Sequence, residues 1–237
     1  MRLSDLLDLM ERLDLGEPGT PRRPPRENLD ALKDALARGL TDGDFRVDCI
    51  EHDLAAWREW ERSGWQGMKP PIVRLPERGL LVTMFYWPPG QVCPPHEHTS
   101  WTLSAVFHNR LEVMTYHWDR AVTERRLARR SLFTAEPGRA GYVYDPAIHS
   151  PRNTFTSGAI SFHIYNTDDD PVLEKQVGPI EGLTTYDGAA DRLPPRTPEF
   201  LLGVRQDVLR LHTEVAHLVP CARTPGILEQ IGRVTLD

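Results

Sequence analysis

Apolar and polar positions divide the chain into zones with different periods, and residues 1–65 form the first. Apolar residues recur there every three or four positions, most clearly in the leucine repeat over residues 29–40, which is the pattern of an amphipathic helix. Three helices are predicted: a short one capped by Ser4, one through the leucine repeat, and one over residues 53–62. The Pro-rich segment 18–25 separates the first two.

Residues 71–166 form the second zone and change to short runs rich in Val, Ile, Tyr, Phe and Trp. Turn residues separate the runs, and no helical pattern intervenes, which predicts an antiparallel sandwich or barrel. Such a barrel can enclose one small-molecule pocket. The predicted strands are Leu80–Trp87, Trp101–Phe107, Glu112–Trp118, Leu127–Thr134, Gly141–Tyr144 and Ile160–Tyr165.

The third zone begins with a segment, 167–196, that is rich in Asp, Pro and Gly and is interpreted as an ordered arm. Helical patterns return after it, because Thr197-Pro198 and Thr224-Pro225 are typical of helix starts. The first of these helices carries an apolar stripe that is expected to pack on the barrel or on a second subunit. Its members are Leu201, Val204, Val208, Leu211, Val215 and Leu218.

These zones predict a mainly β fold, a barrel with helices at both ends. The expected division is an N-terminal helical decoration over residues 1–66, a barrel with the functional site over residues 67–168, and a C-terminal arm with helices over residues 169–237. Helices at the two ends are expected to pack on the barrel.

Composition narrows the class of protein. The net charge of −6 argues against a nucleic-acid partner, because phosphate binding needs clustered surplus cation. Three cysteines without a CxxC spacing argue against a disulfide framework and favour a reducing, cytoplasmic location. No secretory signal and no run of about 18 apolar residues is found, so no membrane association is expected. A monomer or homodimer is expected.

Two histidines at positions i and i+2 are the first candidate for chemistry. His96 and His98 would project from the same face of a strand, while Glu97 faces away. A His-x-His pair alone is weak evidence, because such pairs occur on surfaces by chance. His149 follows 51 residues after His98, far enough for another strand of a closed barrel to bring it to the same interior point. Three imidazoles would hold one transition metal and leave positions open for substrate.

A second polar set lies on one predicted strand. Ser161, His163 and Tyr165 occupy positions i, i+2 and i+4, and apolar residues alternate with them. If this face points into a barrel, three polar groups are buried, which is costly unless they bind one another or a ligand. An ordinary strand that exposes the three side chains to water is the alternative.

The histidine motifs resemble those of a known family. Gly90, five residues and His96-x-His98 resemble the first cupin motif, and His149-x₃-Asn153 resembles the end of the second. The usual cupin glutamate would fall at Thr102 or Leu103, and neither is a carboxylate. The chain is therefore similar to the three-histidine thiol dioxygenases, the cysteine dioxygenase and 3-mercaptopropionate dioxygenase family. That family also carries a Ser-x-His-x-Tyr relay, and its bacterial members a His-x-x-Trp that Trp101 matches.

The resemblance implies a cupin fold, a double-stranded β-helix or jelly-roll barrel, with Fe(II) as cofactor and O₂ as co-substrate. It implies oxidation of a small-molecule thiol, such as cysteine, 3-mercaptopropionate or a related compound, to a sulfinic acid. The implied roles are metal ligation by His96, His98 and His149, catalysis by Tyr165, His163 and Ser161, and substrate binding by Arg74 and Trp101.

Two departures from the family pattern leave the substrate open. Leu103 stands where animal members have a cysteine cross-linked to the relay tyrosine, so no cross-link is expected. Arg74 is the best match for the arginine that holds a substrate carboxylate, but it aligns only with a gap, and Arg78, Arg139 and Arg152 remain alternatives.

Two other functions fit the same motifs. One is a three-histidine cupin oxygenase that cleaves a C–C or C–S bond of another metabolite, and the other is a cupin-like binding protein without catalysis. The remaining histidines are expected to have ordinary surface or capping roles. They are His52, His108, His117, His212 and His217.

Overall fold

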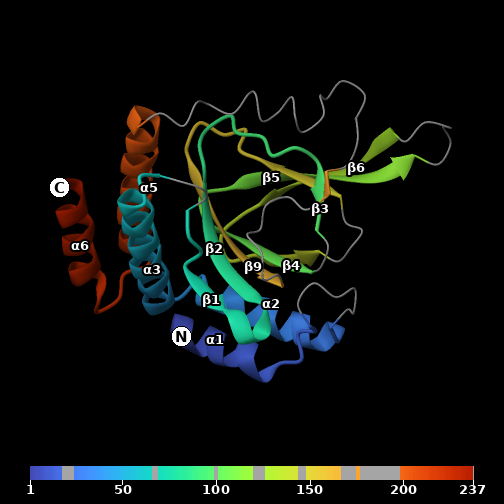
Figure 1. Cartoon of the computed structure of the whole chain (residues 1–237), viewed down its shortest axis with the longest axis horizontal. Helices are drawn as coiled ribbons and strands as arrows, with labels where there is room; N and C mark the ends of the chain where they lie inside the picture. Colours follow the sequence, from blue (N-terminus) through green and yellow to red (C-terminus); the bar gives the residue numbers. More distant parts are fainter. Residues whose placement is uncertain are drawn as a thin grey trace.

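Two antiparallel sheets of five strands each form the centre of the computed structural model, and helices lie at both ends of the chain (Figure 1). The structure describes residues 1–17, 24–65, 69–98, 101–119, 126–143, 148–166, 175–176 and 198–236. The predicted cupin-type barrel with N-terminal and C-terminal helices is confirmed by this arrangement.

The first sheet has the strand order β1-β2-β9-β4-β7 and the second the order β10-β3-β8-β5-β6. Apart from the consecutive pairs β1-β2 and β5-β6, neighbours in each order are far apart in sequence, so the chain crosses between the sheets repeatedly, as a jelly-roll barrel requires. The strands of the first sheet are β1 (Val73–Leu75), β2 (Leu80–Trp87), β9 (Ala159–Asn166), β4 (Thr102–His108) and β7 (Ala140–Val143). Those of the second are β10 (Lys175–Gln176), β3 (His96–Glu97), β8 (His149–Arg152), β5 (Leu111–Asp119) and β6 (Arg126–Ala135).

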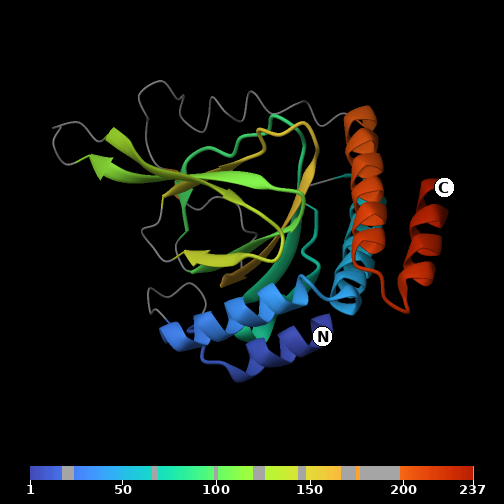
Figure 2. The same ribbon diagram turned by 180° about the vertical axis from the view of Figure 1, so that it is seen from behind.

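The helices cover one side of the barrel. Figure 2 shows α1 and α2 side by side below the sheets, with α3, α5 and α6 standing together at one end. The β5–β6 hairpin points away from this helical end (Figure 1). The helices are α1 (Leu3–Arg12), α2 (Arg26–Gly39), α3 (Gly43–Arg62), α5 (Pro198–Leu218) and α6 (Thr224–Leu236), and a 3-10 turn, η1, spans Pro76–Arg78.

The outer face of the first sheet is buried under these helices. Val82, Leu103 and Phe162 are fully buried in one hydrophobic core with residues of all five helices. The rings of Phe45 on α3 and Phe162 on β9 lie 6.0 Å apart. Because side chains alternate along a strand, this face takes the apolar residues and leaves the intervening positions to the barrel interior. The alternation of β9 is therefore polar inward and apolar outward.

Two helix starts differ from the sequence prediction. α1 begins at Leu3 with Arg2 as its N-cap, so Ser4 lies inside the helix. α3 begins ten residues before the predicted start at Asp53, and the Asp42 side chain caps it by accepting hydrogen bonds from two backbone amides. Its first turns escaped prediction because they bury charged residues, which interrupt an apolar period.

The predicted strands agree with the structure to within one or two residues, and β2 agrees at both ends. The short strands β1, β3, β8 and β10 were not predicted as separate elements, since two to four residues give too little period to recognise. The boundary near residues 66–67, the boundary at 168–169 and the cap residue Thr197 lie outside the described residues. Among the described helices, none is long and apolar enough to cross a bilayer.

Candidate metal centre

Three histidines meet between the two sheets. One ring nitrogen from each of His96, His98 and His149 lies within 4.8 Å of the other two. The ring centroids of His96 and His149 are 4.3 Å apart, and His98 lies 5.1 Å from the first and 5.2 Å from the second. The structure thus brings together the three residues that the sequence predicts as metal ligands.

Strand pairing explains this convergence. His96 on β3 and His149 on β8 are direct antiparallel partners, so their side chains leave the second sheet on the same face. His98 follows the end of β3 two residues after His96, where the strand alternation returns to that face. One local motif and one cross-strand pair are sufficient to build the group.

The segment before β3 is fastened to the residue that follows β8. Asn153 is fully buried, and its side-chain amide donates to the carbonyl of Trp87 at 2.8 Å. The backbone amide of Gly90 donates to the carbonyl of Asn153 at 2.8 Å, and Gly90 has a φ of 82°, which favours glycine. These contacts account for the glycine and asparagine of the two cupin-like motifs: they hold the approach to His96 against the strand that carries His149.

Two of the three histidine rings, those of His96 and His98, are in the neutral state that a metal requires. Nδ1 of His96 lies 2.9 Å from the carbonyl of Pro94, so this nitrogen carries the proton and Nε2 is left as the ligand atom. Burial, and then the neighbouring imidazoles, lower the pKa of His96 well below its usual value. The same causes lower the pKa of His98 to about 3. Neutral rings near pH 7 can donate lone pairs without first losing a proton.

The group fits a single transition-metal ion. Metal–imidazole bonds of about 2.0–2.1 Å place ligand nitrogens about 3 Å apart, which small ring rotations reach from the observed spacing. No carboxylate belongs to the group within the described residues. Three neutral ligands leave a divalent ion with its full charge and with open coordination positions, which favours an anionic ligand from a substrate.

The first sheet faces the histidines with the polar side of β9. The rings of Tyr165 and His98 have their centroids 5.6 Å apart, so Tyr165 lies at the metal centre. Tyr165 is buried, and burial raises the pKa of its phenol, which keeps the hydroxyl protonated. Ser161 and His163 follow on the same face, deeper in the barrel.

His163 is held by two serine hydroxyls. Its Nε2 lies 2.7 Å from Oγ of Ser161, as the predicted relay requires, and its Nδ1 lies 2.8 Å from Oγ of Ser104 on β4. Both ring nitrogens are therefore used, and His163 contacts Tyr165 by stacking, with centroids 5.6 Å apart and planes 14° apart. Burial, and then the charges that neighbouring histidines would carry, lower the pKa of His163 to about 3.

Two members of this network were not assigned roles from the sequence. The indole N–H of Trp87 donates to Oγ of Ser161 at 2.7 Å, and Ser104 completes the other end. The only signal for Ser104 is that Thr102 and Ser104 are polar at alternate positions of an apolar strand. That alternation points them inward, but the partner of Ser104 depends on the register between β4 and β9.

Arg74 lies on the same face of the first sheet as Tyr165. Arg74 pairs with Leu81, and Leu81 pairs with Tyr165, so the three form one cross-strand row. Two strand spacings of about 4.8 Å separate the backbones of Arg74 and Tyr165. Of the alternative arginines, Arg152 binds Glu112 at 3.1 Å, and Arg78 donates to the carbonyl of Leu13.

The expected substrate-binding role of Trp101 requires correction. Its side chain is 2% exposed and belongs to the core between the first sheet and the helices. The indole N–H donates to the carbonyl of Leu15 at 2.8 Å. Trp101 shares the outward alternation of Leu103, so it anchors the end of the α1 segment and does not face the metal centre.

Two histidines outside the centre are also buried rather than at the surface. His212 lies 2.9 Å from Asp53, and His108 lies 3.0 Å from Glu214. Both contacts join α5 to other elements, so these histidines have structural roles.

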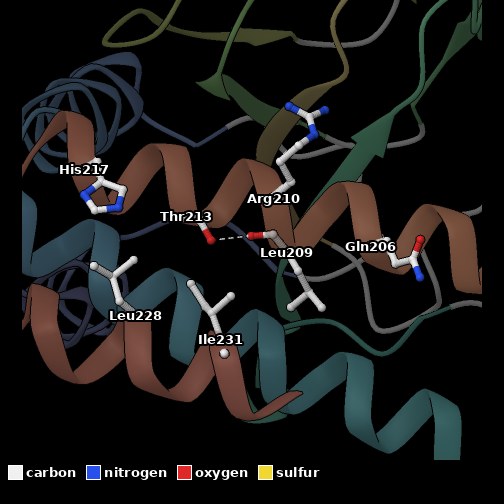
Figure 3. Close-up of a pocket in the computed structure, with 8 residues that line it drawn as sticks. Gln206, Leu209, Arg210, Thr213, His217, Leu228 and Ile231 are labelled. Carbon is white, nitrogen blue, oxygen red and sulfur yellow. Dashed lines mark hydrogen bonds between the residues drawn. The ribbon is translucent and has the colours of Figure 1, made fainter. Parts of the chain in front are cut away.

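The helical end of the molecule contains a cavity of about 430 Å³ between α5 and α6. Figure 3 shows Leu209, Leu228 and Ile231 on its wall, with Arg210 and His217 along α5. Thr213 is bonded to the carbonyl of Leu209 at 2.9 Å within the same helix. None of these residues belongs to the metal centre, which the strands of the barrel provide.

Comparisons with known proteins give limited similarity. No protein-family model and no curated protein matches the chain. A solved structure of TT1209 from Thermus thermophilus is 20% identical, covering 40% of this chain and 77% of that one with a TM-score of 0.30. An oxalate oxidase is 19% identical, with 38% and 43% covered and a TM-score of 0.30.

The dimethylsulfoniopropionate (DMSP) lyase DddQ from Ruegeria pomeroyi is 13% identical, with 42% and 46% covered and a TM-score of 0.30. Similarity at this level identifies no reaction for this chain.

Proposed function

We propose that the chain is a non-haem Fe(II) thiol dioxygenase, which adds both atoms of O₂ to the sulfur of a small-molecule thiol and releases a sulfinic acid. The proposal depends on one observation. Three imidazoles, one buried and two half-buried, converge without a carboxylate ligand in the described residues, and the hydroxyl-bearing ring of Tyr165 lies beside them.

The metal site explains the substrate class. Fe(II) held by His96, His98 and His149 would supply Lewis acidity towards a thiol sulfur and the electrons that make dioxygen reactive. Its uncompensated charge favours a thiolate over a neutral ligand, since no carboxylate of the described residues joins the three histidines. The thiol loses one proton on binding, and the sulfinic acid recovers it on release, so the overall reaction consumes only the thiol and O₂.

The chain's own residues bind and orient the reactants. The Tyr165 hydroxyl, which burial keeps protonated, is proposed to donate a hydrogen bond to a group held at the metal centre, and the proximity of its ring to His98 supports this role. Arg74, in the same cross-strand row, is proposed to bind a carboxylate of the substrate, as in cysteine or 3-mercaptopropionate. Trp87, Val106, Leu111 and Ala159 form a buried apolar cluster beside Ser161, and such a cluster would help to exclude water.

The decisive experiment is an O₂-uptake screen of the protein loaded anaerobically with Fe(II). Cysteine, 3-mercaptopropionate, cysteamine and larger thiols are compared, and the product is analysed by mass spectrometry after reaction with isotopically labelled O₂. The expected result is one O₂ consumed per thiol and both labelled oxygens on sulfur. His149→Ala, prepared in the same way, is expected to be inactive.

Other outcomes assign the chain differently. Labelled oxygen on a carbon product, or a cleaved C–S bond, would make it a three-histidine oxygenase or lyase of another kind. Stoichiometric metal without turnover on any thiol would support a binding protein. A wild-type protein that binds no metal would remove the basis of the whole proposal.

A further inference from the structure

The hydrogen bonds around His163 can be assigned donor by donor. The Trp87 indole nitrogen is only a donor, so Oγ of Ser161 accepts its hydrogen bond at 2.7 Å. A serine hydroxyl has one hydrogen and two lone pairs, and the second contact of Ser161 is Nε2 of His163 at 2.7 Å. Either Ser161 donates its hydrogen to Nε2, or Nε2 carries a hydrogen and donates it to Ser161.

Burial selects the first arrangement. Ser161 is 3% exposed, and its side-chain contacts within the described residues are Trp87 and His163. If Nε2 donated, the hydroxyl hydrogen of Ser161 would have no acceptor among these contacts, and a buried unsatisfied donor costs about 1–3 kcal/mol. Ser161 therefore donates to Nε2, and in a neutral ring the proton then lies on Nδ1.

Ser104 accepts that proton's hydrogen bond. Nδ1 of His163 lies 2.8 Å from its Oγ, and the two residues are direct partners across β4 and β9. Donors and acceptors then alternate from Trp87 through Ser161 and His163 to Ser104. Ser104 is half-buried, so its own hydroxyl hydrogen does not carry the burial penalty that applies to Ser161. The two ends of the ring are fixed from opposite sides, while Phe85 and Tyr165 contact it with centroid distances of 5.2 Å and 5.6 Å.

We propose that Ser104 is a positioning residue, which holds His163 in its Nδ1–H tautomer and turns the face of the imidazole, rather than a nitrogen, toward Tyr165. The face then fixes the plane of the Tyr165 ring beside His98. His163 does not pass a proton to Tyr165 in this arrangement, because both of its nitrogens bind serines. The tautomer depends on the structure alone, and the catalytic consequence rests on the proposed function.

The tautomer can be observed directly by NMR. Long-range proton–nitrogen correlation spectra of the full chain, with isotope-labelled histidine and diamagnetic Zn(II) in place of iron, distinguish Nδ1–H from Nε2–H rings. A His163→Gln spectrum identifies the His163 signals. The wild-type ring is expected as Nδ1–H, and Ser104→Ala is expected to shift it to Nε2–H or to a mixture. A wild-type Nε2–H ring, or a Ser104→Ala spectrum unchanged from wild type, would overturn the proposal.

Two further variants distinguish the hydrogen bond of Ser104 from a general change in packing around His163. Thr83→Val changes the other cross-strand partner of His163, which is also buried, and no described hydrogen bond joins Thr83 to that ring. It is expected to leave the tautomer unchanged. Ser104→Thr keeps the hydroxyl and is expected to restore the Nδ1–H signal. If Ser104→Ala does not fold, the tautomer of the wild-type ring and the spectrum of Ser104→Thr still test the assignment of Ser104.

Kinetics test the consequence for turnover. Ser104→Ala is expected to lower kcat about tenfold, the effect of one lost hydrogen bond, with KM and iron content unchanged. Ser104→Thr should recover most of this loss. A wild-type protein with the Nδ1–H tautomer but no thiol oxidation would reject the proposed function and leave the assignment of Ser104 intact. Thiol oxidation by a wild-type protein with the Nε2–H tautomer would support the proposed function and reject the assignment of Ser104.

Discussion

The contribution of the Tyr165 hydroxyl to turnover can be measured directly. Tyr165→Phe keeps the ring stacked on His163 and removes only the hydroxyl. Because no metal ligand changes, we expect unaltered iron content and a kcat lowered by about 10², the size of a lost positioned proton donor. Steady-state O₂ uptake and metal analysis measure both.

Tyr86→Phe is the matched control for this change. Tyr86 lies on the outer face of β2, and its hydroxyl donates to Asp207 on α5 at 2.9 Å, away from the metal centre. The kcat of the Tyr86→Phe variant should equal that of the wild type. An equal kcat for Tyr165→Phe and wild type would instead show that the Tyr165 hydroxyl has no part in the reaction.

The histidine ligands give a second prediction, which requires no substrate. His149→Ala removes one of three ligands and leaves a buried, two-nitrogen site, so we expect the affinity for Fe(II) or Zn(II) to fall by more than about 100-fold. Competition titration with a chelating dye measures this. His117 is an exposed histidine on the neighbouring strand β5, and His117→Ala should bind metal normally. Wild-type affinity in His149→Ala would exclude this site as the metal centre.

Among the secondary-structure elements, α3 and α5 are joined by a buried charge cluster centred on Asp53. Its carboxylate binds Lys69 at 2.6 Å and His212 at 2.9 Å, and Asp53 itself is 2% exposed. Asp53→Asn leaves the mostly buried Lys69 ammonium without its counter-ion. We expect a loss of about 3–5 kcal/mol in the free energy of unfolding near pH 7, measured by urea denaturation.

The pH dependence of this loss has a defined sign. Burial alone would raise the pKa of Asp53, but Lys69 and His212 outweigh it and bring the pKa to about 2, against 3.8 in an unfolded chain. A lowered native pKa contributes stability above the unfolded value and loses it as the pH falls through the native one. About 2 kcal/mol of the difference between wild type and Asp53→Asn should therefore disappear between about pH 4 and pH 2. Asp34→Asn, at an exposed carboxylate of α2, should change stability little at either pH.

The elements also show which parts of the fold a sequence pattern can reveal. β2 and β9 were predicted almost to the residue, because their side chains alternate between a helix-covered face and the barrel interior. The start of α3 was missed, because Arg46 and Asp48 are buried through hydrogen bonds to Phe107 and Leu3. Those partners are distant in sequence, so the sequence pattern around Arg46 and Asp48 indicates a solvent-exposed segment.

The candidate site also contains residues that the sequence pattern revealed and residues that it did not. The three candidate ligands were recognisable because the spacing of His96 and His98 is local and because His149 lies in a second cupin-like motif. Ser104 was not recognisable, since its role depends on a register shared with His163, 59 residues later. Trp101 was misassigned because it is close to His98 in sequence, whereas strand alternation directs it into the helix core. Proximity along the chain indicates a site only when the side chains also share a face.

On the scale of the whole molecule, the helices and the barrel share a single core. Residues of α1, α2, α3, α5 and α6 pack in one cluster against the outer face of the first sheet. The metal centre lies on the opposite face of that sheet, so the helices support the strand that carries Tyr165 from behind. The division at residues 66 and 168 stays a prediction, and unfolding experiments can test whether the parts fold separately.

Phe162→Ala provides that test, because Phe162 lies where the two parts meet. Its ring is fully buried on β9 and contacts Phe45 of α3 at 6.0 Å between centroids. Removing it leaves a cavity, for which we expect a loss of about 3–5 kcal/mol in the free energy of unfolding. If the helices and barrel form one cooperative unit, the urea midpoints for the circular dichroism of the helices and for Fe(II) or Zn(II) release from the centre should shift together.

Phe133→Ala, at a 50% exposed phenylalanine of β6, is the control and should shift neither transition by more than about 0.5 kcal/mol. Metal release that keeps its wild-type midpoint while the helical signal moves would show that the barrel holds its metal without the helices.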